Sequence, residues 1–127
     1  MPLIFLNGGA MRGGPLNHLL EGAPCAGEVR TAPHYRFYSV GDRFPGLHPV
    51  AYGGAPIAGE LFEVPMQVLR TRLLPAEPPE LELGVIVLDD NRSVLSMLLR
   101  RPIISYPQLI DITDFGSWHT YREETTR

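Results

Sequence analysis

A glycine-rich stretch at residues 7–18 constrains this chain most: four of the eight residues from 7 to 14 are glycines. Residues without side chains contribute little to a core, but they allow backbone N–H groups to approach one another or a ligand. The stretch follows an apolar run at residues 2–6 and precedes a short helical pattern. A loop between a strand and the start of a helix often cradles a small anion. The stretch therefore predicts either an anion-binding loop or a plain strand-to-helix turn.

The spacing of these glycines excludes two phosphate-binding motifs. No Lys-Ser or Lys-Thr pair follows the glycines, as a P-loop requires, and the G-x-G-x-x-G spacing of a dinucleotide fingerprint is absent. The glycine-rich stretch alone therefore identifies no reaction.

Length and charge narrow the class of protein. The 127 residues predict a single domain, residues 1–127, with a sizeable core. The net charge is −3 and no basic cluster occurs, which argues against a nucleic-acid partner. All eleven basic residues are arginines, so lysine Schiff-base chemistry is excluded. A positive group in a pocket must be a guanidinium, which suits bidentate binding of a carboxylate.

Membrane, disulfide and metal signals are weak. No run approaches the roughly 20 apolar residues that span a bilayer, and residues 1–6 lack the basic region of a signal peptide. We therefore expect a cytoplasmic protein with no membrane association. The single Cys25 excludes an intramolecular disulfide framework. The four histidines lack metal-ligand spacing, so we expect no metal and no cofactor. They are His18, His34, His48 and His119.

Short strand patterns outnumber helical ones along the chain. Strands are predicted at residues 2–6, 28–31, 34–40, 49–52, 57–64, 81–88 and 93–99. One helix is predicted at residues 16–21 and another from Pro65, while residues 44–47 and the proline-rich segment 75–80 are predicted as a turn and a loop. This order predicts an α+β fold with a strongly curved sheet or a small barrel.

Three glutamates are candidates for chemistry or for buried charge. Glu77 and Glu80 lie in the stiff proline-rich segment just before a strand. A carboxylate held there and partly desolvated acts as a general base with a raised pKa, whereas the alternative is an exposed acidic loop. Glu60 interrupts an apolar strand face and needs a partner if it is buried, for which Arg30 and Arg36 are candidates.

Two patterns together resemble the γ-glutamylcyclotransferase-like superfamily. They are I-F-L-N-G-G-A at residues 4–10, followed by R-G-G at 12–14, and A-G-E-L-F-E-V-P at 58–65. Members carry a strand that ends in Tyr-Gly-Ser/Thr-Leu and a later Gly-x-Leu-Tyr/Phe-x-Val strand. A closer resemblance is to the C-terminal domain of allophanate hydrolases, which is itself similar to that superfamily. The segments that carry it cover nearly the whole chain in the same order: residues 13–20, 31–38, 45–47 and 112–118.

The resemblance implies a small mixed or antiparallel β-barrel with flanking short helices. It also implies a pocket at the glycine-rich loop, closed by residues 45–47. In allophanate hydrolases the amidase domain performs the first hydrolysis. The C-terminal domain assists with the small carboxylated, urea-derived product, by decarboxylation or by supporting assembly. These 127 residues contain no amidase domain, so we expect a free-standing relative.

The chain departs from both families where chemistry is expected. Residues 7–10, N-G-G-A, replace Tyr-Gly-Ser/Thr-Leu and so lack its aromatic and hydroxyl groups. Glu77 falls near the position of the cyclotransferase catalytic glutamate, but Leu74 replaces the aspartate of the usual Leu-Asp-x-x-Glu pattern. Ala10 stands where allophanate hydrolase relatives often carry a histidine.

These observations predict a domain that binds a small carboxylate or a ureido or carbamate compound. The predicted ligand-binding residues come from the loop, the following helix and one strand: Asn7, Gly8, Gly9, Ala10, Asn17, His18 and Arg36. Loop amides would hold the anionic end, Asn17 or His18 would orient the ligand, and Arg36 would supply countercharge. If the domain is catalytic, Glu77 or Glu80 is the base of a small-molecule cyclotransferase, a lyase or an amide- or carbamate-processing enzyme.

The alternative prediction is a non-catalytic interaction or assembly subunit that forms a homodimer or pairs with an amidase-type enzyme. Residues 102–121, with Phe115, Trp118 and Tyr121, would be its anchor, because aromatic side chains dominate interface hot spots. The pocket discriminates between the two predictions. An enzyme requires a carboxylate that faces the glycine loop across an enclosed pocket, whereas an interaction module predicts a filled pocket and an exposed apolar patch.

Overall fold

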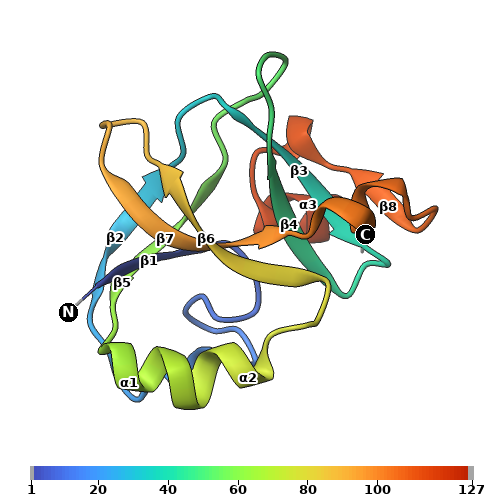
Figure 1. The fold of residues 1–127 in the computed structure, drawn as a ribbon. Coiled ribbons are helices and arrows are strands. Elements are labelled where there is room, and N and C mark those ends of the chain that lie inside the picture. Colours follow the sequence, from blue (N-terminus) through green and yellow to red (C-terminus); the bar gives the residue numbers. More distant parts are fainter. Residues whose placement is uncertain (1, 126–127) are drawn as a thin grey trace.

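The structure is a computed structural model that describes residues 2–125 of the chain. Its eight strands form one mixed sheet, which curls into a half-barrel (Figure 1). The strands are β1 (Leu3–Leu6), β2 (Cys25–Arg30), β3 (Tyr35–Val40), β4 (Phe44–Pro49), β5 (Ala58–Glu63), β6 (Leu81–Val87), β7 (Ser93–Leu99) and β8 (Leu109–Asp111). The predicted α+β class with a curved, barrel-like sheet and few short helices is confirmed.

The helices are short and lie outside the sheet. The 3-10 helices are η1 (Asn17–Leu20), η3 (Arg101–Ser105) and η4 (Thr113–Phe115). The longest helical segment joins α1 (Met66–Val68), the π-helical turn η2 (Leu69–Leu73) and α2 (Leu74–Ala76), and α3 (Trp118–Thr125) ends the described chain. Among the described residues, no helix is both long and apolar enough to cross a membrane.

Strand β7 is the branch point of the sheet. Strand β6 runs antiparallel along one edge of β7, and β1 and β4 run parallel to β7 along the other. Phe5 of β1 lies opposite Ser96, whereas Leu47 of β4 lies opposite Leu98, further along β7. A strand can pair with only one neighbour at each position along one side. Strand β1 therefore pairs with the first part of β7 and β4 pairs with the later part. The sheet therefore opens between the end of β1 and the start of β4.

This opening is where the glycine-rich loop emerges. The loop follows β1 directly, and Figure 1 shows it in blue between the sheet and the helical segment α1–α2. At the far side the half-barrel is closed by a bridge between Thr31, after β2, and Leu88, after β6. The topology thus places a glycine-lined gap at one side of the apolar core.

Apolar side chains fill the two faces of the curved sheet. The inner cluster holds Phe5, Phe37, Leu47, Leu61 and Ile86, all within 1% of complete burial. A second cluster forms between the sheet and the helical segment and includes Ile4, Leu20, Phe62, Leu69 and Leu73. The alternation of β1 and β5 supplies side chains to both clusters, which is why both strands read as nearly continuous apolar runs.

The helical segment after Pro65 extends further than its prolines suggested. The prediction of a loop from residue 75 is wrong at its start, because α2 continues through Ala76 with Pro75 at its first turn. The Leu74 N–H donates to the Leu69 carbonyl across the wider π turn. Pro75 has no N–H to donate to the turn before it, and the helical segment ends one residue later, at Ala76.

The predictions for residues 44–52 are also corrected. Residues 44–47 were expected to turn and 49–52 to form a strand, but β4 spans Phe44–Pro49 and the chain bends after it. Strand β4 pairs with β3 along its whole length, from Val40 opposite Phe44 to Tyr35 opposite Pro49. Pro45 fits within β4 because no strand faces it across the opening beside β1, so no ladder bond is lost there.

The C-terminal helix α3 is tied to the turn between β3 and β4. The Tyr121 hydroxyl donates to Asp42 Oδ1, and the Ser39 hydroxyl donates to the same oxygen at 2.9 Å. These bonds hold the pKa of Asp42 below its ordinary value. Tyr121 is buried, and Trp118 packs against both apolar clusters. These two aromatic residues therefore complete the core of this chain.

Candidate functional site

A pocket of about 260 Å³ occupies the opening in the sheet. The glycine-rich loop forms one wall, from Asn7 to Ala10, and the end of the helical segment forms the opposite wall with Ala76, Glu77 and Pro78. Arg43, Phe44 and Pro45 close a third side at the start of β4, and Met97 of β7 lies where β1 and β4 diverge. The branching of the sheet at β7 is thus what creates the pocket.

Internal hydrogen bonds fix the shape of the glycine loop. The Met11 N–H donates to the Gly8 carbonyl at 3.1 Å, and the Leu16 N–H donates to the Gly9 carbonyl at 2.9 Å. Gly8 also needs to be glycine, because a Cβ there would lie 2.8 Å from Pro45 Cδ. Within residues 2–125, the amides of Gly8, Gly9 and Ala10 donate to no protein acceptor. Three residues of the pocket wall thus carry backbone donors that have no protein partner.

The two asparagines of the loop have different positions. The Asn17 Nδ2 donates to the Ala10 carbonyl at 2.9 Å, so its side chain holds the loop. The Asn7 Nδ2 is buried and finds no acceptor among the described residues. A buried amide donor without a partner is costly, about 1–3 kcal/mol. Because Asn7 lines the pocket, a ligand acceptor would relieve this cost.

Glu60 anchors the other end of the loop. Its carboxylate accepts the Arg12 N–H at 2.7 Å and the Arg12 Nε–H at 3.0 Å, and Glu60 is only 7% exposed. The sequence predicted a partner for a buried Glu60, and that part is confirmed. The prediction of Arg30 or Arg36 as this partner is wrong, because the glycine loop brings Arg12 next to Glu60 on β5.

We expect Glu60→Ala to destabilise the fold by about 2 kcal/mol, because it removes two charge-assisted hydrogen bonds and leaves both Arg12 donors without this acceptor. Chemical unfolding would measure this loss. Glu28→Ala is the matched control, since Glu28 is exposed and lies 3.8 Å from the same guanidinium. Exposed pairs contribute about 0–1 kcal/mol. Equal losses in the two variants would contradict the anchoring role of Glu60.

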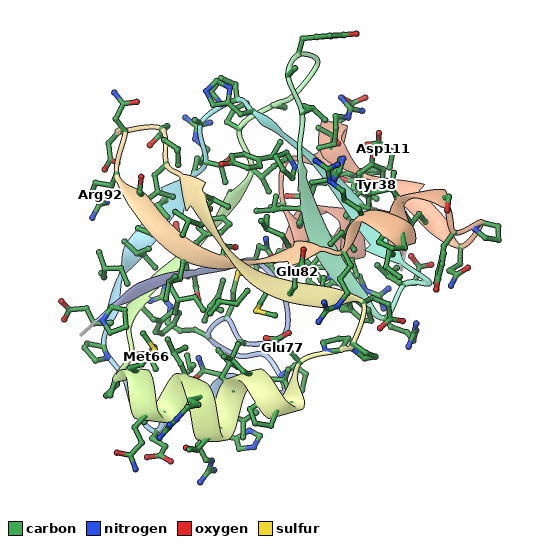
Figure 2. The ribbon with its side chains drawn as sticks, in the orientation of Figure 1. Tyr38, Met66, Glu77, Glu82, Arg92 and Asp111 are labelled. Atoms are coloured by element: carbon green, nitrogen blue, oxygen red, sulfur yellow. The ribbon has the colours of Figure 1, made fainter. Side chains whose placement is uncertain are left out.

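Glu77 faces the glycine loop across the pocket. Figure 2 shows its side chain pointing from the end of α2 toward the N-terminal loop, beneath β6. Its N–H caps the helix by donating to the Leu74 carbonyl at 3.2 Å. Burial raises the pKa of Glu77 to about 7. Near neutral pH this carboxyl therefore exists in both protonation states, as a group that accepts and returns a proton must.

Glu80 lies outside the pocket lining and holds Arg43. Its Oε2 accepts the Arg43 Nη2–H at 3.3 Å, while its Oε1 is buried and has no partner among the described residues. The Arg43 guanidinium also lies over the ring of Phe44, 5.2 Å from its centroid. Of the two predicted bases, Glu77 lines the pocket and Glu80 positions the arginine beside it.

Two other predicted binding residues lie away from the pocket. His18 is exposed on η1. Arg36, on β3, donates to Asp111 Oδ2 at 2.6 Å and to the Gly53 carbonyl at 2.8 Å. The arginine that lines the pocket is Arg43. It lies in the turn between β3 and β4, and the sequence alone did not indicate that this turn reaches the pocket. Residues 2–125 contain no cluster of three or more acidic, histidine or cysteine side chains that could hold a metal.

Comparison with known proteins gives consistent results. The family model of the allophanate hydrolase C-terminal domain matches residues 2–123. A crystal structure of a uropathogenic E. coli-specific protein is 35% identical with a TM-score of 0.89, covering 96% of this chain and 95% of that one. Among curated proteins, no match is found.

Two further structures place the fold in a wider context. Kluyveromyces lactis allophanate hydrolase is 25% identical with a TM-score of 0.88 over 97% of this chain, which spans 21% of that protein. An AIG2-like protein from Mus musculus shares the fold, with 21% identity and a TM-score of 0.65 over 85% of this chain and 82% of that one. The predicted resemblance is confirmed: the chain belongs to the allophanate hydrolase C-terminal domain family, which has a γ-glutamylcyclotransferase-like fold.

Proposed function

We propose that this domain binds a small carboxylate, ureido or carbamate compound in the pocket between the glycine loop and α2, and that Glu77 transfers a proton to or from it. The single observation that carries the proposal is the position of the half-buried Glu77, across the pocket from the unpaired amides of Gly8, Gly9 and Ala10.

The loop wall suits the anionic end of such a ligand. Successive backbone amides in a loop can form a concave anion site without a full positive charge. The buried Nδ2 of Asn7 adds a fourth donor. Arg43 supplies positive charge at the rim, in the role predicted for Arg36, although Glu80 already balances part of it. This arrangement favours one carboxylate over a multiply charged group such as a triphosphate.

The helix wall suits proton transfer. As a base, Glu77 takes a proton from an amine or a water that attacks a carbonyl group. As an acid, it gives a proton to the nitrogen that is left when a carbamate loses carbon dioxide. A positioned proton-transfer group contributes about 10² to 10⁴ in rate. The pocket therefore supports a cyclotransferase, a lyase or an amide- or carbamate-processing reaction, all of which need this step.

NMR titration of the full chain tests the binding proposal. We expect N-carbamoylglycine and N-acetylglycine to shift the amide resonances of Gly8, Gly9 and Ala10 and the side-chain amide of Asn7. The neutral N-acetylglycinamide is the matched control and should shift them little. In Asn7→Ala, which removes one donor, we expect about tenfold weaker binding. Loop resonances that ignore both carboxylates, or respond equally to the amide, would contradict the proposal.

A second proposal is assembly with an amidase-type enzyme. It is supported by the K. lactis proteins, in which the region matching this chain covers 21% of allophanate hydrolase and 8% of urea amidolyase. Of the predicted anchor residues, Tyr121 is buried and Trp118 is half-buried, while Phe115 is 36% exposed. A pocket that side chains leave unfilled and that is lined by a carboxylate agrees better with the first proposal. Co-purification with an amidase-type protein that is lost in Phe115→Ser would favour the second.

A further inference from the structure

We propose that the ligand site has a second part, an outer cleft that receives the uncharged end of an elongated ligand whose anionic end lies against the glycine loop. The inference rests on the proposed function and adds the form of the ligand to it. The cleft has a volume of about 240 Å³ and lies between α2 and β6.

Glu77 belongs to both cavities. Four residues line the inner pocket and the outer cleft alike: Glu77, Pro78, Leu81 and Met97. In Figure 2, Glu77 lies below β6 and Glu82 lies on that strand, on either side of the space between the helix and the hairpin. Glu77 is thus part of the boundary that the two cavities share. A ligand that fills both places its central bond beside the Glu77 carboxyl.

The walls of the outer cleft define the chemistry of the second end. Leu74 of α2 and Leu83 of β6 are specific to this cleft and apolar, and Leu83 is 39% exposed. The two charged residues that line this cleft and not the inner pocket, Glu82 and Arg100, pair with each other at 3.2 Å. Because these charges are already balanced, the cleft favours an uncharged group with apolar surface over an ion.

The two cavities together describe an acylated or carbamoylated amino acid. Its carboxylate meets the glycine-loop amides, its amide or ureido group lies beside Glu77, and its acyl or carbamoyl substituent enters the outer cleft. This places the N–C(=O) bond, where a proton is taken or given, next to the only carboxyl that lines the inner pocket among the described residues.

A pair of ligands and a pair of variants test the outer cleft. N-acetylglycine and N-benzoylglycine share the anionic end and differ in the size of the acyl group, so calorimetric titration should show tighter binding of N-benzoylglycine. Leu83→Trp would fill the cleft. The affinity for N-benzoylglycine should fall at least about tenfold, and the affinity for N-acetylglycine should change by no more than about twofold. Val85→Trp is the matched control, because Val85 lies two residues further along the same face of β6, is 63% exposed and lines neither cavity.

The outcomes separate the two proposals. If both compounds bind and Leu83→Trp weakens neither, or weakens both to the same extent as Val85→Trp does, the outer cleft is overturned and the inner pocket stands. If neither compound binds the wild-type chain, the proposed function fails for carboxylates of this class, and the outer cleft fails with it.

Discussion

Gly14→Ala should abolish ligand binding and destabilise the fold by at least about 2 kcal/mol. A Cβ at residue 14 would lie 2.2 Å from the Gly9 carbonyl oxygen and 3.0 Å from that of Met11. Both atoms belong to the backbone, so no side-chain rotation can relieve the clash, and the loop must change shape. The Gly9 carbonyl also accepts the Leu16 N–H, so the hydrogen bond that closes the loop is lost with it.

Gly9→Ala provides the matched control for this prediction. A Cβ there would meet Pro15 at 3.5 Å, an ordinary contact distance. We therefore expect Gly9→Ala to change the free energy of unfolding by less than about 0.5 kcal/mol. Chemical unfolding and an amide NMR spectrum of both variants would measure the difference. A Gly14→Ala variant with wild-type stability and unchanged loop resonances would contradict the loop geometry.

Glu77→Gln should stabilise the chain at pH 8 by about 2 kcal/mol and have little effect on stability at pH 4. Burial raises the pKa of Glu77 from 4.5 to about 7. The folded state therefore retains its proton more strongly than the unfolded state. The contribution of Glu77 to stability is therefore fully present below pH 4.5 and is lost as the pH rises through about 7. The elevation corresponds to about 3 kcal/mol for complete burial, and residual solvent exposure lowers this value.

The same substitution separates stability from function. Glutamine keeps the shape of the side chain but cannot accept and return a proton, so any turnover should fall by about 10² or more. Glu63→Gln is the control, because Glu63 is exposed at the end of β5 and away from the pocket lining. Thermal unfolding at pH 4, 6 and 8 would show the pH-dependent gain only in Glu77→Gln. A gain that is equal at all three pH values would contradict a titrating buried carboxyl.

Local sequence patterns predicted the parts of the site that depend on neighbouring residues. The apolar run before the glycines gave β1, and glycines without side chains gave a loop with free amides. The proline-rich segment held a glutamate in place at the start of β6. In each of these cases, backbone preferences over a few residues determine the structure.

The parts of the site that the sequence did not predict depend on contacts between residues far apart in the chain. Arg12 meets Glu60 across 48 positions, and Arg43 enters the pocket because β4 replaces β1 beside β7. The prolines of β4 and α2 suggested breaks, but Pro45 lies within a strand beside the opening in the sheet, and Pro75 lies in the last turn of the helical segment. No local pattern indicates which arginine a folded sheet brings to a carboxylate, so Arg30 and Arg36 were wrong choices for Glu60.

The most direct test of this account is the titration of the Glu77 carboxyl carbon by NMR, with and without N-acetylglycine. We expect a pKa of about 7 for Glu77 in the free chain and a higher value in the complex, because a bound carboxylate nearby favours the protonated form. The Glu77→Gln spectrum assigns the resonance. A Glu77 pKa near 4.5 that does not respond to N-acetylglycine would contradict both the burial of the carboxyl and its place in a ligand site.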